Sequence, residues 1–251
     1  MWRVTLTVAI ALLAGCTGFL PAGPTVDDGD PVTPAPVPTS SPDATVTVPT
    51  SDGAVDVDRL LDRHERALAT RSFHRRIVRD GPHNTLDVWV DRDADVRRVR
   101  QQFGPLTDDT VVSNGTAYHN VRDDPNTPYT TTNITGNASL TDSPSGRAVL
   151  ELLLANRTYR QVGTFTWNGR PVAVLAPTAT SDTTPAAANE SVVVTSRLYV
   201  DRQGIVRYVE HDEKRPQAQD LSLEMTVSTD VERVPIPWWL AENDPYSSGS
   251  T

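Results

Sequence analysis

The residue with the most distinctive chemistry in this sequence is Cys16, the only cysteine in 251 residues. It ends the run Leu13-Ala14-Gly15-Cys16, in which two small residues leave the backbone before the cysteine open to a processing peptidase. An ionised thiol is the best target for alkylation on such a chain. The run therefore predicts covalent chemistry at one sulfur atom, and a single cysteine excludes a disulfide within the chain.

The segment before Cys16 is short and apolar and follows a positive charge. Arg3 precedes the small and apolar run 4–13, about half of the roughly 20 residues that a helix needs to cross a bilayer, so residues 1–15 are expected to be a cleavable export signal. The order leucine, alanine, glycine, cysteine resembles the lipobox of lipoproteins, whose cysteine carries a diacyl- or diphytanyl-type glyceryl lipid. Two such chains hold a protein stably on a membrane. We therefore expect lipidation of Cys16 and a membrane anchor on the extracellular face; the alternative is an ordinary signal peptide with a chance cysteine.

Sequons for N-glycosylation occur five times, and each places an asparagine two residues before serine or threonine. Sequons arise easily by chance in a threonine-rich chain, but five in an exported protein favour a glycosylated surface. The expected acceptors are Asn114, Asn133, Asn137, Asn156 and Asn189.

Other residues that could do chemistry form no familiar constellation. Asp91, Asp93 and Asp95 have the spacing that opens a calcium loop, but Val96 and Gln102 stand where that loop needs glycine and glutamate, which favours a plain turn. The chain has no nucleophile elbow, glycine-rich phosphate loop, HExxH or CxxC. We therefore expect no metal, no cofactor and no enzyme, with a hydrolase assembled in space as the less favoured alternative. The histidines are scattered: His64, His74, His83, His119 and His211.

Eight arginines fall between positions 71 and 100. They predict a solvated strand face paired with aspartates on neighbouring strands, because opposite charges placed across antiparallel strands attract. The alternative is a patch that binds phosphate or acidic glycans. The residues are Arg71, Arg75, Arg76, Arg79, Arg92, Arg97, Arg98 and Arg100.

The overall composition is acidic, with a formal net charge of −9, which argues against nucleic acid as a partner. Lys214 is the only lysine, and aspartate, threonine and valine are abundant. This balance resembles that of haloarchaeal proteins, in which acidic surfaces maintain solubility at very high salt.

Composition also divides the chain. Residues 16–54 are rich in proline, threonine and serine and cannot bury enough apolar surface to fold, so they predict a disordered tether that follows the lipidated cysteine. Residues 55–241 are long enough for one domain, and 242–251 are a polar tail.

The pattern within the domain is mixed. Residues 57–68 and 145–154 have helical spacing, whereas 221–231 alternate strictly between apolar and polar residues, as in an antiparallel sheet with one covered face. Two hairpins share one plan, in which an apolar-aromatic-Val-Asp-Arg run leads through a turn to a Val-Arg-x-Val run; they cover 88–99 and 198–209.

Lipobox, tether, first helix and repeated hairpins together resemble haloarchaeal lipoproteins of unknown function and, through them, the LolA-like carriers and the LppX-type lipid-binding lipoproteins. The resemblance implies an α+β fold in which a curved antiparallel β-sheet, a half-open barrel, has helices covering its concave face. It implies no catalytic residue.

The resemblance also implies an apolar groove between sheet and helices. We hypothesise that a lipid or other apolar ligand binds there, on a membrane-anchored extracytoplasmic lipoprotein; the alternative is a cell-envelope module that binds another protein and needs no ligand. For the two tryptophans, the alternative is that one fills a core edge and the other lies under a loop. The expected groove residues are Val149, Leu153, Leu223, Met225, Val227, Trp238 and Trp239.

Overall fold

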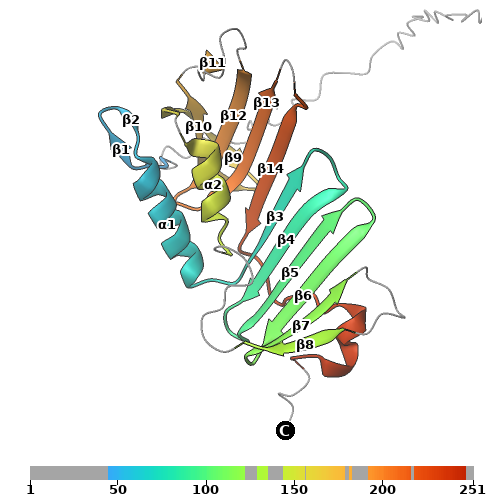
Figure 1. Ribbon diagram of the computed structural model, residues 1–251. Helices are drawn as coiled ribbons and strands as arrows, with labels where there is room; N and C mark the ends of the chain where they lie inside the picture. The colour runs from blue at the N-terminus through green and yellow to red at the C-terminus, as the bar shows by residue number, and fades with distance from the viewer. Residues whose placement is uncertain are drawn as a thin grey trace, which may run out of the picture. The chain divides into compact units, whose positions relative to one another are not determined.

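Most of the chain forms antiparallel strands, because its apolar residues alternate with polar ones over short runs separated by turns (Figure 1). The computed structural model describes residues 45–121, 129–134, 144–155, 157–178, 181–182, 192–215 and 218–246. The elements are β1 Thr50–Ser51, β2 Ala54–Val55, α1 Val57–Ala69, β3 Phe73–Arg79, β4 Asn84–Asp91, β5 Val96–Phe103, β6 Leu106–Ser113, β7 Thr116–Val121, β8 Thr130–Asn133, α2 Arg147–Leu154, β9 Tyr159–Trp167, β10 Arg170–Pro177, β11 Ser181–Asp182, β12 Val192–Asp201, β13 Val206–Lys214, β14 Leu221–Ser228 and the 3-10 helix η1 Trp238–Asn243.

One large sheet dominates this part of the chain. Its strand order is β8-β7-β6-β5-β4-β3-β14-β13-β12-β10-β9, with β11 added beside β12, and every pairing is antiparallel. The last strand, β14, joins β3 to β13 and so connects two sets of hairpins that are far apart in sequence. The edge strands β8 and β9 do not pair with each other, so the sheet stays open, as expected for a half-open barrel.

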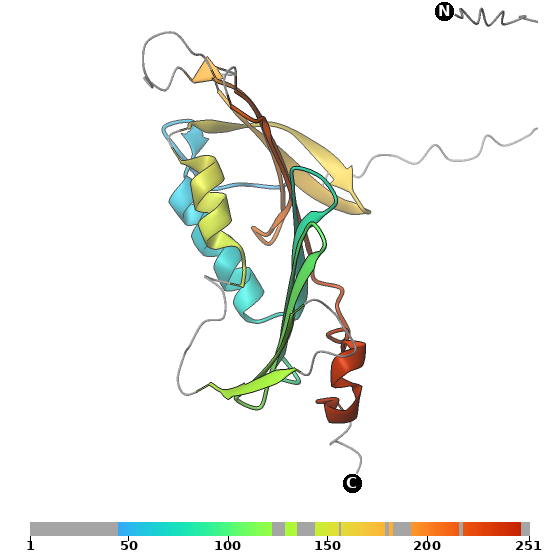
Figure 2. The same cartoon turned by 45° about the vertical axis from the view of Figure 1, so that its right-hand side comes forward.

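The helices α1 and α2 lie on the concave face of the sheet, while η1 lies on the opposite, convex face (Figure 2). Helix α1 begins where the Asp56 carboxylate accepts a hydrogen bond from the Arg59 N–H at 3.1 Å. The buried side of α1 carries three leucines and that of α2 carries three more, and all six pack against strand residues in one apolar core. These observations confirm the predicted α+β class and the helical cover.

A second, smaller apolar cluster lies on the convex face. Residues 231–246 cross β4 to β7 there and bury Val234, Trp239 and Leu240 against Val96 and Val111. The Arg98 guanidinium fixes this crossing by donating to the Pro235 carbonyl at 2.7 Å and to both oxygens of Asp109 at 2.6 and 2.9 Å.

The folded part extends beyond the boundaries taken from composition. Val46 and Val48, inside the stretch expected as tether, are buried in the main core because β-branched apolar residues alternate there with small polar ones. Tyr246, inside the expected polar tail, accepts a hydrogen bond from the Val234 N–H and donates one to Asp91. Short segments of low average hydrophobicity thus join the core through single well-placed side chains.

Candidate functional site

Five of the residues expected to line an apolar groove lie together in the core. Val149 and Leu153 of α2 and Leu223, Met225 and Val227 of β14 all belong to the core between helices and sheet. The structure therefore brings these five residues into one neighbourhood. Four of them are buried and Val149 is partly buried, so they act as packed core.

Trp238 and Trp239 do not join that neighbourhood. Trp239 is buried in the convex cluster, whereas Trp238 is 52% exposed at the start of η1. The segment from Pro235 to Pro237 leads into the 3-10 helix η1, in which Trp239 is buried and Trp238 is exposed. The two tryptophans are thus on the wrong side of the sheet to line a concave groove.

A cavity of about 250 Å³ lies at the margin of the helical cover. Val90, Arg97 and Val112 line it from three adjacent strands, where they are direct cross-strand partners on the concave face. Ile134 and Pro144 add apolar wall, and Arg92 lies at the same cavity. Asp91 and Asp95 line it too, so the site combines aliphatic surface with two guanidinium groups and two carboxylates.

Arg97 makes no hydrogen bond or ion pair with any residue in the described ranges. Partial burial lowers the pKa of its guanidinium, and the positive charge of nearby Arg92 lowers it further. The predicted pairing with aspartates across the strand therefore fails for Arg97, because its cross-strand partners Val90 and Val112 are apolar.

Arg75 departs even further from the expected solvated strand face. It lies on the concave side of β3 between Val88 and Val227 and is only 2% exposed. Burial lowers the pKa of its guanidinium to about 10, and Nε has no hydrogen-bond partner. Sequence reasoning missed this site because the apolar partners of Arg75 come from strands that are not recognisable as neighbours before β14 is placed.

The loop that leads into α2 is held beside Arg75 by His64 of α1. Nδ1 of His64 accepts from the Val206 N–H at 3.1 Å, so Nε2 carries the proton and donates to the Ser145 carbonyl, also at 3.1 Å. Burial lowers the pKa of this imidazole to about 4, so it is neutral near pH 7. His64 is therefore a packed, fully bonded core residue that fixes the start of α2.

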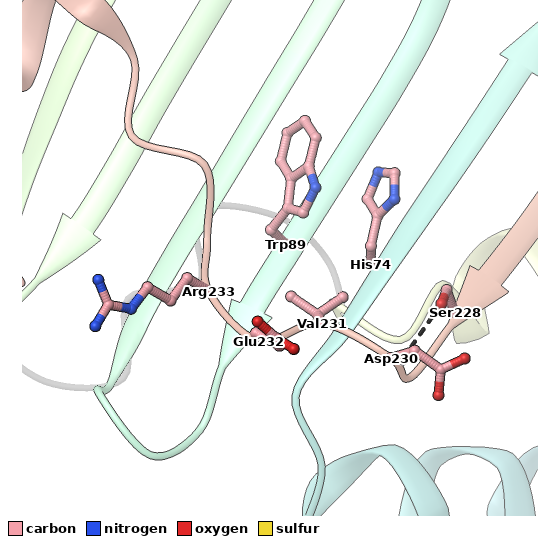
Figure 3. Close-up of a pocket in the computed structure, with 7 residues that line it drawn as sticks. All are labelled: His74, Trp89, Ser228, Asp230, Val231, Glu232 and Arg233. Carbon is pink, nitrogen blue, oxygen red and sulfur yellow. Dashed lines mark hydrogen bonds between the residues drawn. The ribbon is translucent and has the colours of Figure 1, made fainter.

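A second, wider hollow of about 530 Å³ lies on the convex face beside the segment 228–233 (Figure 3). His74 stacks on Trp89 with ring centroids 4.6 Å apart, and its Nε2 lies 2.8 Å from Asp87 Oδ1. Ser228 is the cross-strand partner of His74, so serine, histidine and aspartate meet on three adjacent strands.

This convex trio does not have the geometry of a hydrolase. A nucleophilic serine must share a hydrogen bond with the imidazole that the carboxylate orients. Within the described ranges, Ser228 Oγ instead accepts from the Asp230 N–H at 3.3 Å, and no hydrogen bond joins it to His74. The contact that would activate the serine is missing.

Among the described residues, no group of three His, Cys, Asp or Glu side chains lies close enough to hold a metal ion. None of the helices within those ranges combines the length and apolar character that crossing a bilayer requires.

The expected modification sites are only partly within view. Asn114 lies in the turn between β6 and β7 and Asn133 at the end of β8, and both side chains are exposed. Cys16, Asn137, Asn156 and Asn189 lie outside the described residues.

Comparison with known proteins gives similarity of fold. No protein-family model matches the chain, and no curated protein sequence matches it. Among solved structures, the chain is similar to the lipoprotein LppX of Mycobacterium tuberculosis, with 15% identity, a TM-score of 0.39 and coverage of 72% of this chain and 97% of that one. It is also similar to LprF from Mycobacterium bovis, with 11% identity, a TM-score of 0.40 and coverage of 72% of this chain and 96% of that one. The match to the MucA/MucB complex of Pseudomonas aeruginosa has 20% identity, a TM-score of 0.33 and coverage of 72% of this chain and 59% of that one. Similarity at this level concerns architecture, so the function must be argued from the site itself.

Proposed function

We propose that this chain is a lipid-anchored extracytoplasmic protein that binds an apolar or amphiphilic ligand on the concave face of its sheet. The observation that carries the proposal is the 250 Å³ cavity, in which Val90, Val96, Val112, Ile134 and Pro144 form apolar wall beside Asp91 and Asp95. Small-molecule sites are typically concave and mostly apolar, with a few polar groups that orient the ligand, and here Arg92 and Arg97 provide such groups.

The proposed ligand site therefore lies at the edge of the helices, whereas the sequence predicted a groove between the helices and the sheet. Under α1 and α2 the leucines fill the space, whereas beyond them the concave face of β5 and β6 continues with little cover from the described residues. Val99 is partly buried against the core, and Phe103 and Leu106 further out are exposed. Thr110, Gln101 and Asp108 lie on the same face between them, so an acyl chain that runs outward from the cavity also passes polar side chains.

The test is binding of a fluorescent fatty acid to the full chain, followed by native mass spectrometry. Val112→Trp fills the cavity, and we expect it to weaken binding at least about tenfold, since a displaced apolar ligand loses several buried CH₂ groups. Val162→Trp on the exposed face of β9 is the matched control and should bind like the wild type. Unaltered binding by Val112→Trp, with circular dichroism showing a folded protein, would overturn the proposed site.

The anchor is tested separately. We expect Cys16→Ser to move the protein from the membrane fraction to the soluble fraction, because the thiol is the only site for a thioether-linked lipid. A variant that still co-sediments with membranes would contradict the proposed lipidation.

A second candidate function, a cell-envelope module that binds a protein, is favoured by one observation. Phe103 and Leu106 are direct cross-strand partners, and Val121 lies on the same face of β7 close by; all three are large, apolar and exposed. If fatty acid does not bind the wild type, we expect crosslinking through this patch to capture an envelope protein, with the capture lost in Phe103→Ser.

A further inference from the structure

Arg75 is a positively charged residue buried in the core. Its side chain is 2% exposed, it lies between Val88 and Val227, and none of the described residues accepts a hydrogen bond from its Nε. A buried guanidinium whose Nε is unsatisfied is unfavourable, so native proteins rarely keep one without a use.

The guanidinium points to the start of α2. A Cβ atom on Gly146 would lie 2.5 Å from Nη1 of Arg75 and 2.9 Å from its Cδ, so only glycine allows the helix to begin directly against this side chain. Gly146 has no side chain to cap the helix, and the first turn contains no acidic residue. The positive end of the helix dipole and a positive guanidinium thus face each other.

The N-terminus of helix α1 has the side-chain cap that Gly146 cannot provide for α2. Asp56 caps its N-terminus by accepting from the Arg59 N–H, and Asp58 adds a carboxylate to the first turn. The start of α1 thus has two carboxylates, whereas the start of α2 has only the neutral Ser145 hydroxyl, which accepts from the Arg147 N–H at 3.4 Å.

Nearby groups do not compensate for Arg75 either. The carboxylate of Glu65 lies 3.2 Å from Arg147, and that of Asp201 lies 2.7 Å from Arg207, so both are engaged with other cations. His64 is neutral because burial lowers its pKa to about 4. Within the described ranges no further carboxylate is paired with Arg75, and an anion bound from outside would balance its charge.

Arg75 and Gly146 do not line the cavity at the margin of the helices, but residues close to them along the chain do. Pro144, which lines the cavity, is two residues before Gly146, and Val90 is two residues along β4 from Val88, the direct partner of Arg75. Arg97 lines the cavity and has no described partner of its own.

We propose that Arg75 and the N-terminus of α2 bind the anionic headgroup, a carboxylate or a phosphate, of an amphiphile whose apolar part lies in the concave cavity. The inference rests on the proposed function and names its ligand class. Guanidinium groups and helix N-termini both donate hydrogen bonds to such oxyanions, and Arg97 adds a second positive charge along the entry path.

The experiment compares three probes on the full chain: oleate, oleyl alcohol and inorganic phosphate. Oleate and oleyl alcohol have matching unsaturated hydrocarbon chains and differ in headgroup charge, while phosphate tests whether a free anion suffices. Arg75→Met removes the charge at similar length, Arg75→Lys keeps it, and Arg76→Met is the control, because Arg76 is the next residue on β3 and faces the opposite side.

We expect the wild type to bind oleate roughly 10- to 100-fold more tightly than the alcohol, as charge-assisted hydrogen bonds are lost with the neutral head. Arg75→Met should abolish this preference and still bind the alcohol, while Arg76→Met and Arg75→Lys should retain the preference. If Arg75→Met does not fold, Arg75→Gln, which also removes the charge, replaces it.

Each other result has a definite meaning. Equal binding of oleate and alcohol, or a preference that survives Arg75→Met, overturns the inference but leaves the proposed function standing. Arg75-dependent binding of phosphate without binding of either oleyl probe supports the anion site and overturns the apolar-ligand function. Binding of none of the probes overturns both.

Discussion

The hairpins β4–β5 and β12–β13 share one sequence plan, yet they hold equivalent arginines in different ways. Arg207 of the second hairpin donates from Nε to Asp201 at 2.7 Å and from Nη1 to Thr229 at 3.0 Å. Arg97, at the same place in the first hairpin, has no described hydrogen bond or ion pair and lines the concave cavity.

The register explains the difference. In β12–β13 the pairing shifts between Tyr199 and Val200, so that Val200 pairs with Val206 and Arg207 becomes an extra, bulged residue. In β4–β5 the pairing is regular, and Arg97 lies directly across from Val90 on the concave face. A single bulge thus decides whether the arginine turns to its aspartate or to the cavity.

The aspartates follow the same division. Oδ1 of Asp201 and of Asp91 each accept from two backbone N–H groups of their turns. Oδ2 of Asp201 binds Arg207, whereas Oδ2 of Asp91 accepts from the Tyr246 hydroxyl. In the first hairpin, therefore, the C-terminal segment takes the place of the arginine, which remains available to a ligand.

The largest effect should come from Arg207→Met. It leaves the buried Asp201 carboxylate without its cation, and we expect the free energy of unfolding to fall by about 3–5 kcal/mol. Urea denaturation at constant salt measures this. Adding Asp201→Asn to the same protein should recover part of the loss; a loss below about 1 kcal/mol for the single variant would break the comparison.

The second effect concerns His64. Of the two hairpins, it contacts the second, where Nδ1 accepts a hydrogen bond from the Val206 N–H. Burial lowers its pKa to about 4 in the folded state from 6.5, so the unfolded chain binds the proton more readily. Stability should therefore fall as pH decreases from about 6.5 to about 4, with His64 contributing about 3 kcal/mol over that window. His64→Gln should flatten the slope relative to wild type; parallel curves would contradict the assignment.

Next in size is Gly204→Ala in the turn of the second hairpin. Gly204 has a φ of +85°, and a Cβ there would lie 2.9 Å from the Cβ of Arg63 on α1, so we expect a loss of about 1–2 kcal/mol. The equivalent residue of the first hairpin is Ala94, and Ala94→Gly should cost less than about 1 kcal/mol. Thermal unfolding of the pair measures the difference, and equal losses would remove this distinction between the turns.

The smallest effect on stability should come from Arg97→Met. Because Arg97 has no described partner to leave unpaired, we expect the free energy of unfolding to change by less than about 1 kcal/mol. The variant should nevertheless weaken oleate binding. A loss as large as that of Arg207→Met would show that the two arginines have the same structural role.

Much of this fold was predictable because it depends on local patterns. Alternation over residues 221–228 and the helical spacing of 57–68 each determine their element with little help from the rest of the chain. The fold class follows from these elements together, since a sheet with one apolar face needs a helical cover.

The site was less predictable, for two physical reasons. The regular register of β4–β5 and the place of β14 beside β3 are properties of strand pairing, and they decide that Arg97 lies across from Val90 and that Arg75 is buried. Likewise, the residues of the second helix and of β14 were expected to line a groove, but their volumes fill the space that was expected to be empty. The sequence pattern shows which faces are apolar; packing decides where space is left.

The position of β14 has a consequence for how the protein forms. Strand β3 ends at residue 79 and pairs with a strand that begins at residue 221, so a long stretch of polypeptide must be present before the two meet. Loop closure over such a separation is entropically costly and makes folding slow. The sheet can therefore be completed only after nearly all of the chain has been synthesised, because β14 is needed to join its two sets of hairpins.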